Sequence, residues 1–165
     1  MVNITYVDKD DRVIGAGPTR EAHEKGIIHR VIRIYLYNSK GEVLMQKRAD
    51  HLSTNPGKWN ESVAGHVDEG ETYREAAERE MKEEIGVTGV ELTEVKKIYM
   101  EEREEHGRKR FTTLYTGNYD GDVRPDPSEV SQVKWFSPEA LKRKIELRPK
   151  DFSEGSRRCY HALLE

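Results

Sequence analysis

The chain has 165 residues, of which 36% are charged and 35% apolar, and its formal net charge is −3. This length is typical of one domain, and the lack of a basic excess argues against duplex nucleic acid as a partner. Cys159 is the only cysteine, which excludes an internal disulfide and fits a reducing compartment. No signal-peptide pattern opens the chain, and no apolar run approaches the roughly 20 residues of a membrane span. We therefore expect a cytoplasmic protein without a membrane partner, in which residues 1–165 form a single domain.

The first part of the chain predicts an N-terminal extension over residues 1–28. Residues 3–17 read as a hairpin around a polar turn, and residues 18–26 as a short helix ended by Gly26. Residues 29–38 and 42–48 are rich in β-branched and aromatic side chains, so they predict a second hairpin. A loop is expected over residues 49–62, which contain Pro56 and Gly57.

The rest of the chain predicts one long helix, three strands and two terminal helices. The helix covers residues 72–85, with Thr72 and Glu75 as a capping box and Gly86 at its end. Strands are expected over 91–103, 109–119 and 130–137, with turns or loops at 104–108 and 124–129. Helices are expected over 137–147 and 154–165. This order predicts an α+β domain in which helices flank a mixed sheet.

Three glutamates, Glu80, Glu83 and Glu84, crowd into five positions of the long predicted helix. At about 100° per residue they share the face that carries small and aromatic residues, which is the face expected to meet the rest of the protein. Carboxylates there need compensation, and hard oxygen ligands suit magnesium, manganese or calcium. We expect no basic partner for Glu83 or Glu84 four residues away. A charge-rich surface helix is the alternative that the helical wheel leaves equally open.

The loop before this helix favours the metal interpretation. Gly65 and Gly70 permit a tight turn, and Arg79 can orient one carboxylate by a charge-assisted hydrogen bond. Gly65, Glu71 and the run Arg79–Val87 resemble the Nudix box, G-x5-E-x7-R-E-U-x-E-E-x-G-U with U a bulky aliphatic residue, without a departure. Nine constrained positions at fixed spacing make this resemblance specific.

The resemblance implies the Nudix fold, a three-layer α/β/α sandwich around a central mixed sheet, with the box at residues 65–87. Glu80 and Arg79 would be catalytic, Arg79 would orient Glu80, and Glu71 would brace the loop. The implied cofactor is Mg²⁺, with Mn²⁺ as the alternative. The implied reaction is attack of water on phosphorus in a small nucleoside-diphosphate-type substrate. The implied metal ligands are the Gly65 carbonyl, Glu80, Glu83 and Glu84.

A wider resemblance, over about residues 7–141, is to the isopentenyl-diphosphate isomerase branch of this superfamily. That branch uses a reactive cysteine and a glutamate, and it has a metal site of three histidines and two glutamates. His23, His29 and His66 fall at the matching histidine positions, which makes them a candidate second metal site. For each histidine alone, a surface or core-edge role is the alternative.

The chain departs from the isomerase pattern at the reactive positions. Ala64 stands where the cysteine is expected, and Arg108 and Arg110 stand where acids are expected. The complete Nudix box and the missing cysteine favour a hydrolase over an isomerase. A non-catalytic diphosphate-binding module is a third hypothesis. The acidic run Met100–His106 is expected to be a solvated hairpin tip, with a catalytic base among its glutamates as the alternative.

Overall fold

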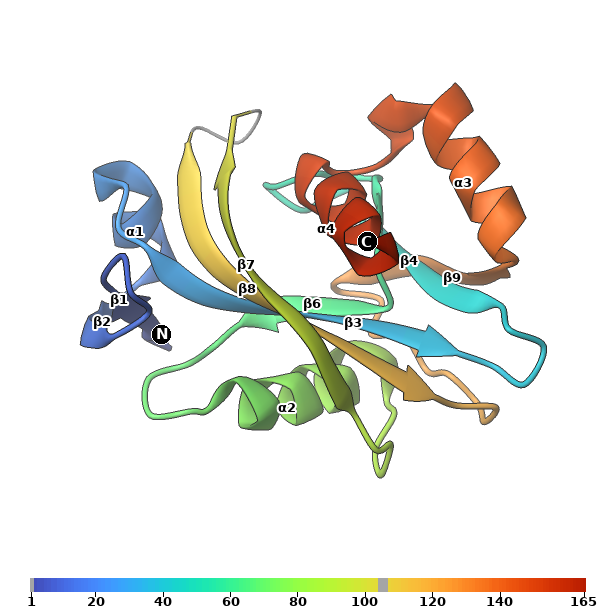
Figure 1. Cartoon of the computed structure of the whole chain (residues 1–165), viewed down its shortest axis with the longest axis horizontal. Coiled ribbons are helices and arrows are strands. Elements are labelled where there is room, and N and C mark those ends of the chain that lie inside the picture. The colour runs from blue at the N-terminus through green and yellow to red at the C-terminus, as the bar shows by residue number, and fades with distance from the viewer. Residues whose placement is uncertain (1, 104–106) are drawn as a thin grey trace.

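The structure is a computed structural model that describes residues 2–103 and 107–165. Within this part of the chain, nine strands form one sheet (Figure 1). The strands are β1 (Ile4–Val7), β2 (Val13–Gly17), β3 (His29–Tyr37), β4 (Val43–Arg48), β5 (Trp59–Asn60), β6 (Val63–His66), β7 (Thr93–Glu102), β8 (Arg108–Asn118) and β9 (Val130–Phe136). The helices are α1 (Thr19–Lys25), α2 (Tyr73–Ile85), α3 (Pro138–Leu147) and α4 (Glu154–Leu164), with a 3-10 turn at Pro149–Asp151.

Strand β3 is the centre of the sheet. It pairs in parallel with β8 along its whole length, from His29 opposite Arg110 to Tyr37 opposite Asn118. Its other edge pairs antiparallel with β1, β6 and β4 in turn. The sheet is therefore mixed, as the sequence predicted. Strand β1 joins it directly, so the N-terminal hairpin is continuous with the main sheet.

Helices cover both faces of the sheet (Figure 1). Successive side chains of β3 point to opposite faces, so β3 contributes residues to the core on both sides. Ile32, Ile34 and Leu36 pack with the buried face of α2. Tyr35 belongs to a second apolar cluster, built with residues of α3 and α4. The predicted α+β class and three-layer arrangement are confirmed. None of the helices in the described ranges is long and apolar enough to cross a bilayer.

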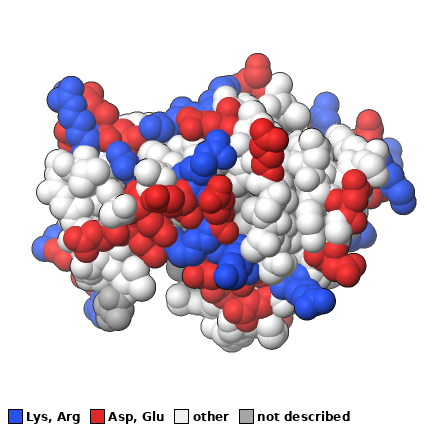
Figure 2. Space-filling model, turned by 90° about the horizontal axis from the view of Figure 1, so that it is seen from below, with Lys and Arg blue, Asp and Glu red and all other residues white. Residues whose placement is uncertain are grey.

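Helix α2 begins and ends where the sequence predicted. The Thr72 hydroxyl accepts a hydrogen bond from the Glu75 N–H (3.1 Å), and the Glu75 carboxylate accepts one from the Thr72 N–H (2.8 Å). This reciprocal pair is the predicted capping box. Gly86 ends the helix at φ 66°, a left-handed conformation that glycine adopts without steric cost. On the face that carries α2, acidic side chains gather in the middle of the surface (Figure 2).

Three expectations for irregular segments were wrong, namely the loop at 49–62, the loop through Gly65 and the solvated tip at 100–106. The expected loop at 49–62 contains strand β5, and β6 runs through the start of the box, pairing from Val63 to His66 with β3. Alanine and glycine in β6 give it a weak strand propensity, so only its pairing with a distant strand defines it. The acidic run at 100–106 is not all solvated, because Glu102 is 1% exposed. Residues 104–106 lie outside the described residues.

Candidate active site

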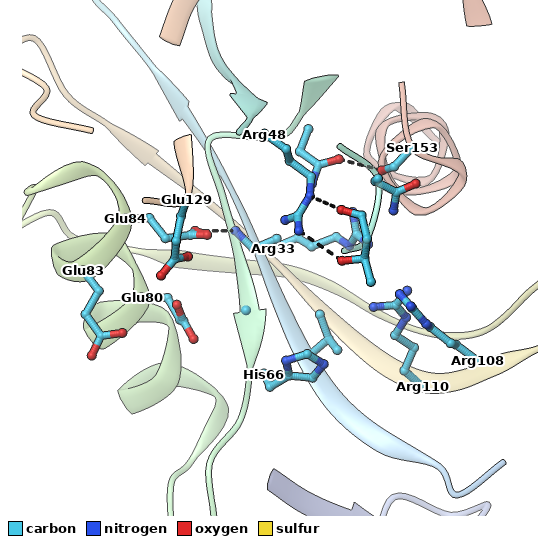
Figure 3. A pocket seen from close by; sticks show the side chains of 16 residues that line it. Arg33, Arg48, His66, Glu80, Glu83, Glu84, Arg108, Arg110, Glu129 and Ser153 are labelled. Atoms are coloured by element: carbon cyan, nitrogen blue, oxygen red, sulfur yellow. Dashed lines mark hydrogen bonds between the residues drawn. The ribbon is translucent and has the colours of Figure 1, made fainter. Parts of the chain in front are cut away.

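A cleft of about 300 Å³ is lined by residues of α2, of strands β3 to β6 and β8, and by the N-cap of α4, and it carries opposite charges at its two ends (Figure 3). Carboxylates from α2 and from the segment before β9 lie at one end, and guanidinium groups from β3 and β8 at the other. His66 of β6 lies between the two groups (Figure 3). The charged and polar side chains that line the cleft include Arg33, Arg48, Asn60, His66, Glu80, Glu83, Glu84, Arg108, Arg110, Glu129 and Ser153.

The box glutamates line the acidic end at different depths. The side chain of Glu83 is 55% exposed and that of Glu80 14%, whereas Glu84 is buried. The Glu84 carboxylate accepts hydrogen bonds from the Gln46 side chain (3.3 Å) and the Ala64 N–H (3.2 Å). Sequence reasoning placed all three on the side of α2 that faces the protein, and the structure brings them together there.

Burial and the repulsion of neighbouring carboxylates raise the pKa values of Glu80 and Glu84. Desolvation, with smaller contributions from Glu83 and Glu129, raises the pKa of Glu80 to about 7 although Arg79 opposes the change. Desolvation, then Glu80 and Glu129, raises the pKa of Glu84 well above its ordinary value. A divalent cation would favour the ionised form of both groups. The site therefore carries more negative charge than Arg79 offsets, as a cation site does.

Gly65 of β6 lies directly against this group. A β-carbon at residue 65 would stand 2.2 Å from the Glu80 carboxyl carbon, a distance that real β-carbons do not reach. Glycine is needed here for close approach, since its backbone angle is not in the left-handed region. The predicted metal ligands Gly65, Glu80, Glu83 and Glu84 thus share one end of the cleft, and their chemistry fits a hard divalent cation.

Arg79 connects the loop of the box to its helix. Its guanidinium donates to both carboxylate oxygens of Glu71 (2.6 and 2.9 Å), to Glu80 (2.9 Å) and to the His66 carbonyl (3.0 Å). Glu71 in turn accepts the Asp68 N–H (2.9 Å). These are the contacts that an orienting Arg79 and a bracing Glu71 require. The fork geometry of arginine makes such a set of simultaneous bonds possible.

One expectation about these charges was wrong. Arg79 is four residues before Glu83 and contacts its carboxylate at 3.2 Å, so Glu83 does have a basic partner on α2. The contact is half exposed, and surface pairs of this kind add little stability. Glu84 keeps only the neutral donors named above among its described hydrogen bonds.

Glu129 is the acidic-end residue that sequence reasoning missed. It lines the cleft from the segment before β9, and Glu80 and Glu84 both have pKa values raised by its charge. Burial also raises the pKa of Glu129 itself. The sequence does show that Glu129 directly precedes strand β9, so it lies where a loop returns to the sheet. Because Glu129 is more than 40 residues after the box, the sequence does not show that it meets Glu80 and Glu84.

The three predicted histidines do come together. Ligand atoms of His23, His29 and His66 lie within 4.8 Å of one another, and each Nε2 is buried without a hydrogen-bond partner. Burial lowers the pKa of His23 to about 4 and that of His29 to about 3, and it also lowers the pKa of His66. Neutral imidazoles can ligate a transition metal.

The surroundings of these histidines differ from those of an ordinary cation site. Arg108 and Arg110 lie close enough to lower the pKa of all three histidines further. The structure therefore places guanidinium groups beside the histidines, at the positions where the isomerase pattern expects carboxylates. Positive charge there opposes a bound cation. The three imidazole donors thus favour a bound metal ion, whereas the positive charge of the adjacent arginines opposes one.

Comparison with known proteins establishes the family. A model of the Nudix domain matches residues 27–162, so the chain belongs to the Nudix family. It is 32% identical over 136 residues to an uncharacterised Nudix hydrolase of Pseudomonas aeruginosa, covering 82% of this chain and 79% of that protein. It is 30% identical over 164 residues to the isopentenyl-diphosphate Delta-isomerase of Burkholderia multivorans, and the match covers 98% of this chain and 90% of the isomerase. The crystal structure of DR0079 from Deinococcus radiodurans superposes with a TM-score of 0.74 at 25% identity, and the match covers 88% of this chain and 90% of DR0079.

These similarities confirm both resemblances seen in the sequence. The box places the chain in the Nudix family, and the long match to an isomerase agrees with the isomerase-like pattern outside the box. Relatives of both names are similarly close, so the choice between hydrolysis and isomerisation depends on the site.

Proposed function

We propose that this protein is a divalent-metal-dependent Nudix hydrolase that cleaves a diphosphate linkage in a small nucleoside-diphosphate-type substrate. The main support is the three carboxylates of Glu80, Glu84 and Glu129. Burial raises the pKa of each, and they line the same end of the cleft as Gly65. Mg²⁺ suits these oxygen donors, and Mn²⁺ is the alternative. When bound, the ion would offset phosphate charge and lower the pKa of the attacking water.

The residues of the chain have distinct roles in this proposal. Glu80, Glu83 and Glu84 hold the ion together with the Gly65 carbonyl, and we add Glu129 as a further ligand or as the base that removes the proton of the water. Arg79 fixes the Glu80 carboxylate through a 2.9 Å hydrogen bond, and Glu71 holds Arg79. Glu83 is the most exposed of the three box glutamates.

A substrate panel tests the proposal. The purified protein is incubated with Mg²⁺ and with nucleoside diphosphates, triphosphates, nucleotide sugars and dinucleotides, and the released phosphate or monophosphate is measured. We expect turnover of at least one class, loss of turnover with EDTA, and strong loss in Glu84→Gln. A folded protein that turns over no member of the panel would contradict the proposal.

Isopentenyl-diphosphate isomerisation is the second candidate, because a relative with that name matches 98% of the chain. Ala64 and Arg110 argue against it, since neither side chain can donate or accept a proton as a cysteine or glutamate does. Conversion of isopentenyl to dimethylallyl diphosphate at high enzyme concentration would support this candidate. Its absence, alongside hydrolysis of a panel member, would exclude it.

We propose the cluster of His23, His29 and His66 separately as a second metal site. Three unpartnered imidazole nitrogens support it, and the adjacent arginines oppose it. Titration with Co²⁺, followed by the visible absorption of the bound ion, tests it in the wild type and in His29→Asn. Loss of a saturable spectrum in the variant would support histidine ligation, whereas identical spectra would remove it.

A further inference from the structure

The cleft has a cationic end that the chemistry at the glutamates does not use. Arg33 comes from β3, and Arg108 and Arg110 come from β8, the strand parallel to β3. Arg108 and Arg110 are two residues apart on one strand, so both side chains point to the same face of the sheet. They lie across the cleft from Glu80 and Glu83 (Figure 3).

Two of these arginines are buried in a network that leaves donors unused. Arg33 donates to Glu61 at 2.6 Å and lies 3.6 Å from Glu102, which also pairs with Arg110. The side chains of Arg33 and Arg110 are only 5% and 9% exposed. In each, Nε is buried and has no hydrogen-bond partner. A buried, unpaired N–H donor is costly, and an anion in the cleft could accept from such a donor.

The local charge at this end favours an anion. Two buried carboxylates, Glu61 and Glu102, contact Arg33 and Arg110, and Arg108 adds a further guanidinium to the same wall. Burial, opposed by Glu102 but reinforced by Arg33 and Arg108, lowers the pKa of Arg110. Desolvation is the main cause of this lowering, and the like charges of Arg33 and Arg108 add to it.

Helix α4 adds its positive end to the same place. Ser153, its N-cap, lines the cleft and accepts the Ser156 N–H at 3.1 Å while donating to Asn60 at 2.6 Å. Gly155 packs so closely that a β-carbon there would stand 2.3 Å from the Arg33 Nη2. The first turn of α4 therefore lies directly on the arginine network, and its dipole favours negative charge nearby.

We propose that the arginine end of the cleft is a specificity subsite for a phosphate monoester carried by the substrate in addition to its diphosphate. The proposal rests on the hydrolase function for the placement of the diphosphate at the glutamate end. Guanidinium groups recognise a phosphate dianion by paired, charge-assisted hydrogen bonds. The preferred substrates would thus be diphosphates with a separate phosphorylated hydroxyl, such as a 2′- or 3′-phosphorylated nucleotide.

Binding of inorganic phosphate to the metal-free protein tests the subsite by itself. In EDTA the glutamate end repels phosphate, so calorimetry reports the arginine end. We expect saturable binding that is weakened about tenfold or more in Arg108→Gln, which removes a charge-assisted contact. Arg143→Gln, the matched control on the exposed face of α3, should stay within about twofold of wild type, since its charge is screened by solvent. No binding by the wild type, or equal weakening in both variants, would overturn the proposal.

Matched substrates separate this proposal from the proposed function. Turnover is compared for ADP-ribose and its 2′-phosphorylated form, and for NADH and NADPH. We expect a lower KM for the phosphorylated member, and a rise in that KM in Arg108→Gln with kcat little changed. Equal KM values for both members would overturn the subsite and leave the hydrolase standing. If no substrate is hydrolysed at all, the hydrolase fails, and the phosphate titration still decides the subsite. Arg108 is half-buried, so Arg108→Gln should fold, and its melting temperature checks this.

Discussion

Gly65 and Glu80 are in direct contact, because the backbone of β6 leaves room for the Glu80 carboxylate only where residue 65 has no side chain. Gly65→Ala should therefore displace this carboxylate while the fold survives, since the far end of a glutamate side chain can move. A displacement of about 1 Å in a catalytic group can cost a hundredfold in rate. We expect turnover to fall by that order and the Mg²⁺-induced rise in melting temperature to shrink. Gly15→Ala is the control, because nothing lies within 4 Å of a β-carbon there.

Glu83→Gln tests the exposed member of the proposed metal site. The change removes a charge and little volume, so turnover should fall about a hundredfold, as is common when charge stabilisation is lost. Without metal the melting temperature should change little, because loss of the half-exposed contact with Arg79 offsets the relief of repulsion from Glu80. Glu78→Gln, on the exposed face of α2, should change neither quantity. Full activity together with an unchanged Mg²⁺ shift would remove Glu83 from the metal site.

Arg79→Lys tests whether the fork geometry matters as well as the charge. Lysine keeps the charge but cannot bond both oxygens of Glu71 while also reaching Glu80. We expect kcat to fall more than tenfold, as expected for a misplaced carboxylate, with a smaller change in KM. Steady-state kinetics on the best panel substrate checks this. Equal kinetics for Arg79→Lys and wild type would mean that charge alone is sufficient.

The stability of the metal-free protein should depend on pH through the ionisation of Glu80. Its pKa in the folded, metal-free protein is raised to about 7, so the folded state binds this proton more tightly than the unfolded chain does. This group therefore lowers stability progressively as pH rises from about 4.5 to 7. Glu80→Gln removes this penalty, so its metal-free melting temperature should gain on wild type across that window.

The same proton competes with the cation. The Mg²⁺-induced rise in melting temperature of the wild type should be small at pH 5.5 and should increase through pH 7, because the ion binds the ionised carboxylate. Calorimetric melts with and without Mg²⁺ at each pH measure this. An Mg²⁺ shift that is constant from pH 5.5 to 8 would show that Glu80 does not couple to the ion.

The parts of this molecule that depend on nearby residues could be predicted from the sequence. The capping box of α2, its glycine stop and the hairpin of β3 and β4 all depend on neighbours in the chain. The face of α2 that carries Glu80, Glu83 and Glu84 follows from helical periodicity alone. The histidine cluster, with residues from α1, β3 and β6, was found through the family resemblance, because no local pattern connects its members.

The parts that depend on distant strands could not be predicted in the same way. Strand β6 exists because it pairs with β3, and Glu129 reaches the cleft because β9 pairs with β4. The buried position of Arg33 could not be predicted either, since a charged residue in a run of apolar strand residues usually faces solvent. Here Glu61 and Glu102 compensate its charge beneath α4, and the sequence does not show that these residues meet.

The parallel pairing of β3 with β8 has a consequence for how this protein folds. It joins residues about half the chain apart, and the whole box lies in the connection between the two strands. Closing so long a loop is entropically costly and typically slow. The arginines of β8 can face the glutamates of α2 only after that closure. A nascent or refolding chain would thus contain every residue of the box and still lack the assembled cleft, so recovery of metal-dependent activity should be among the last events of refolding.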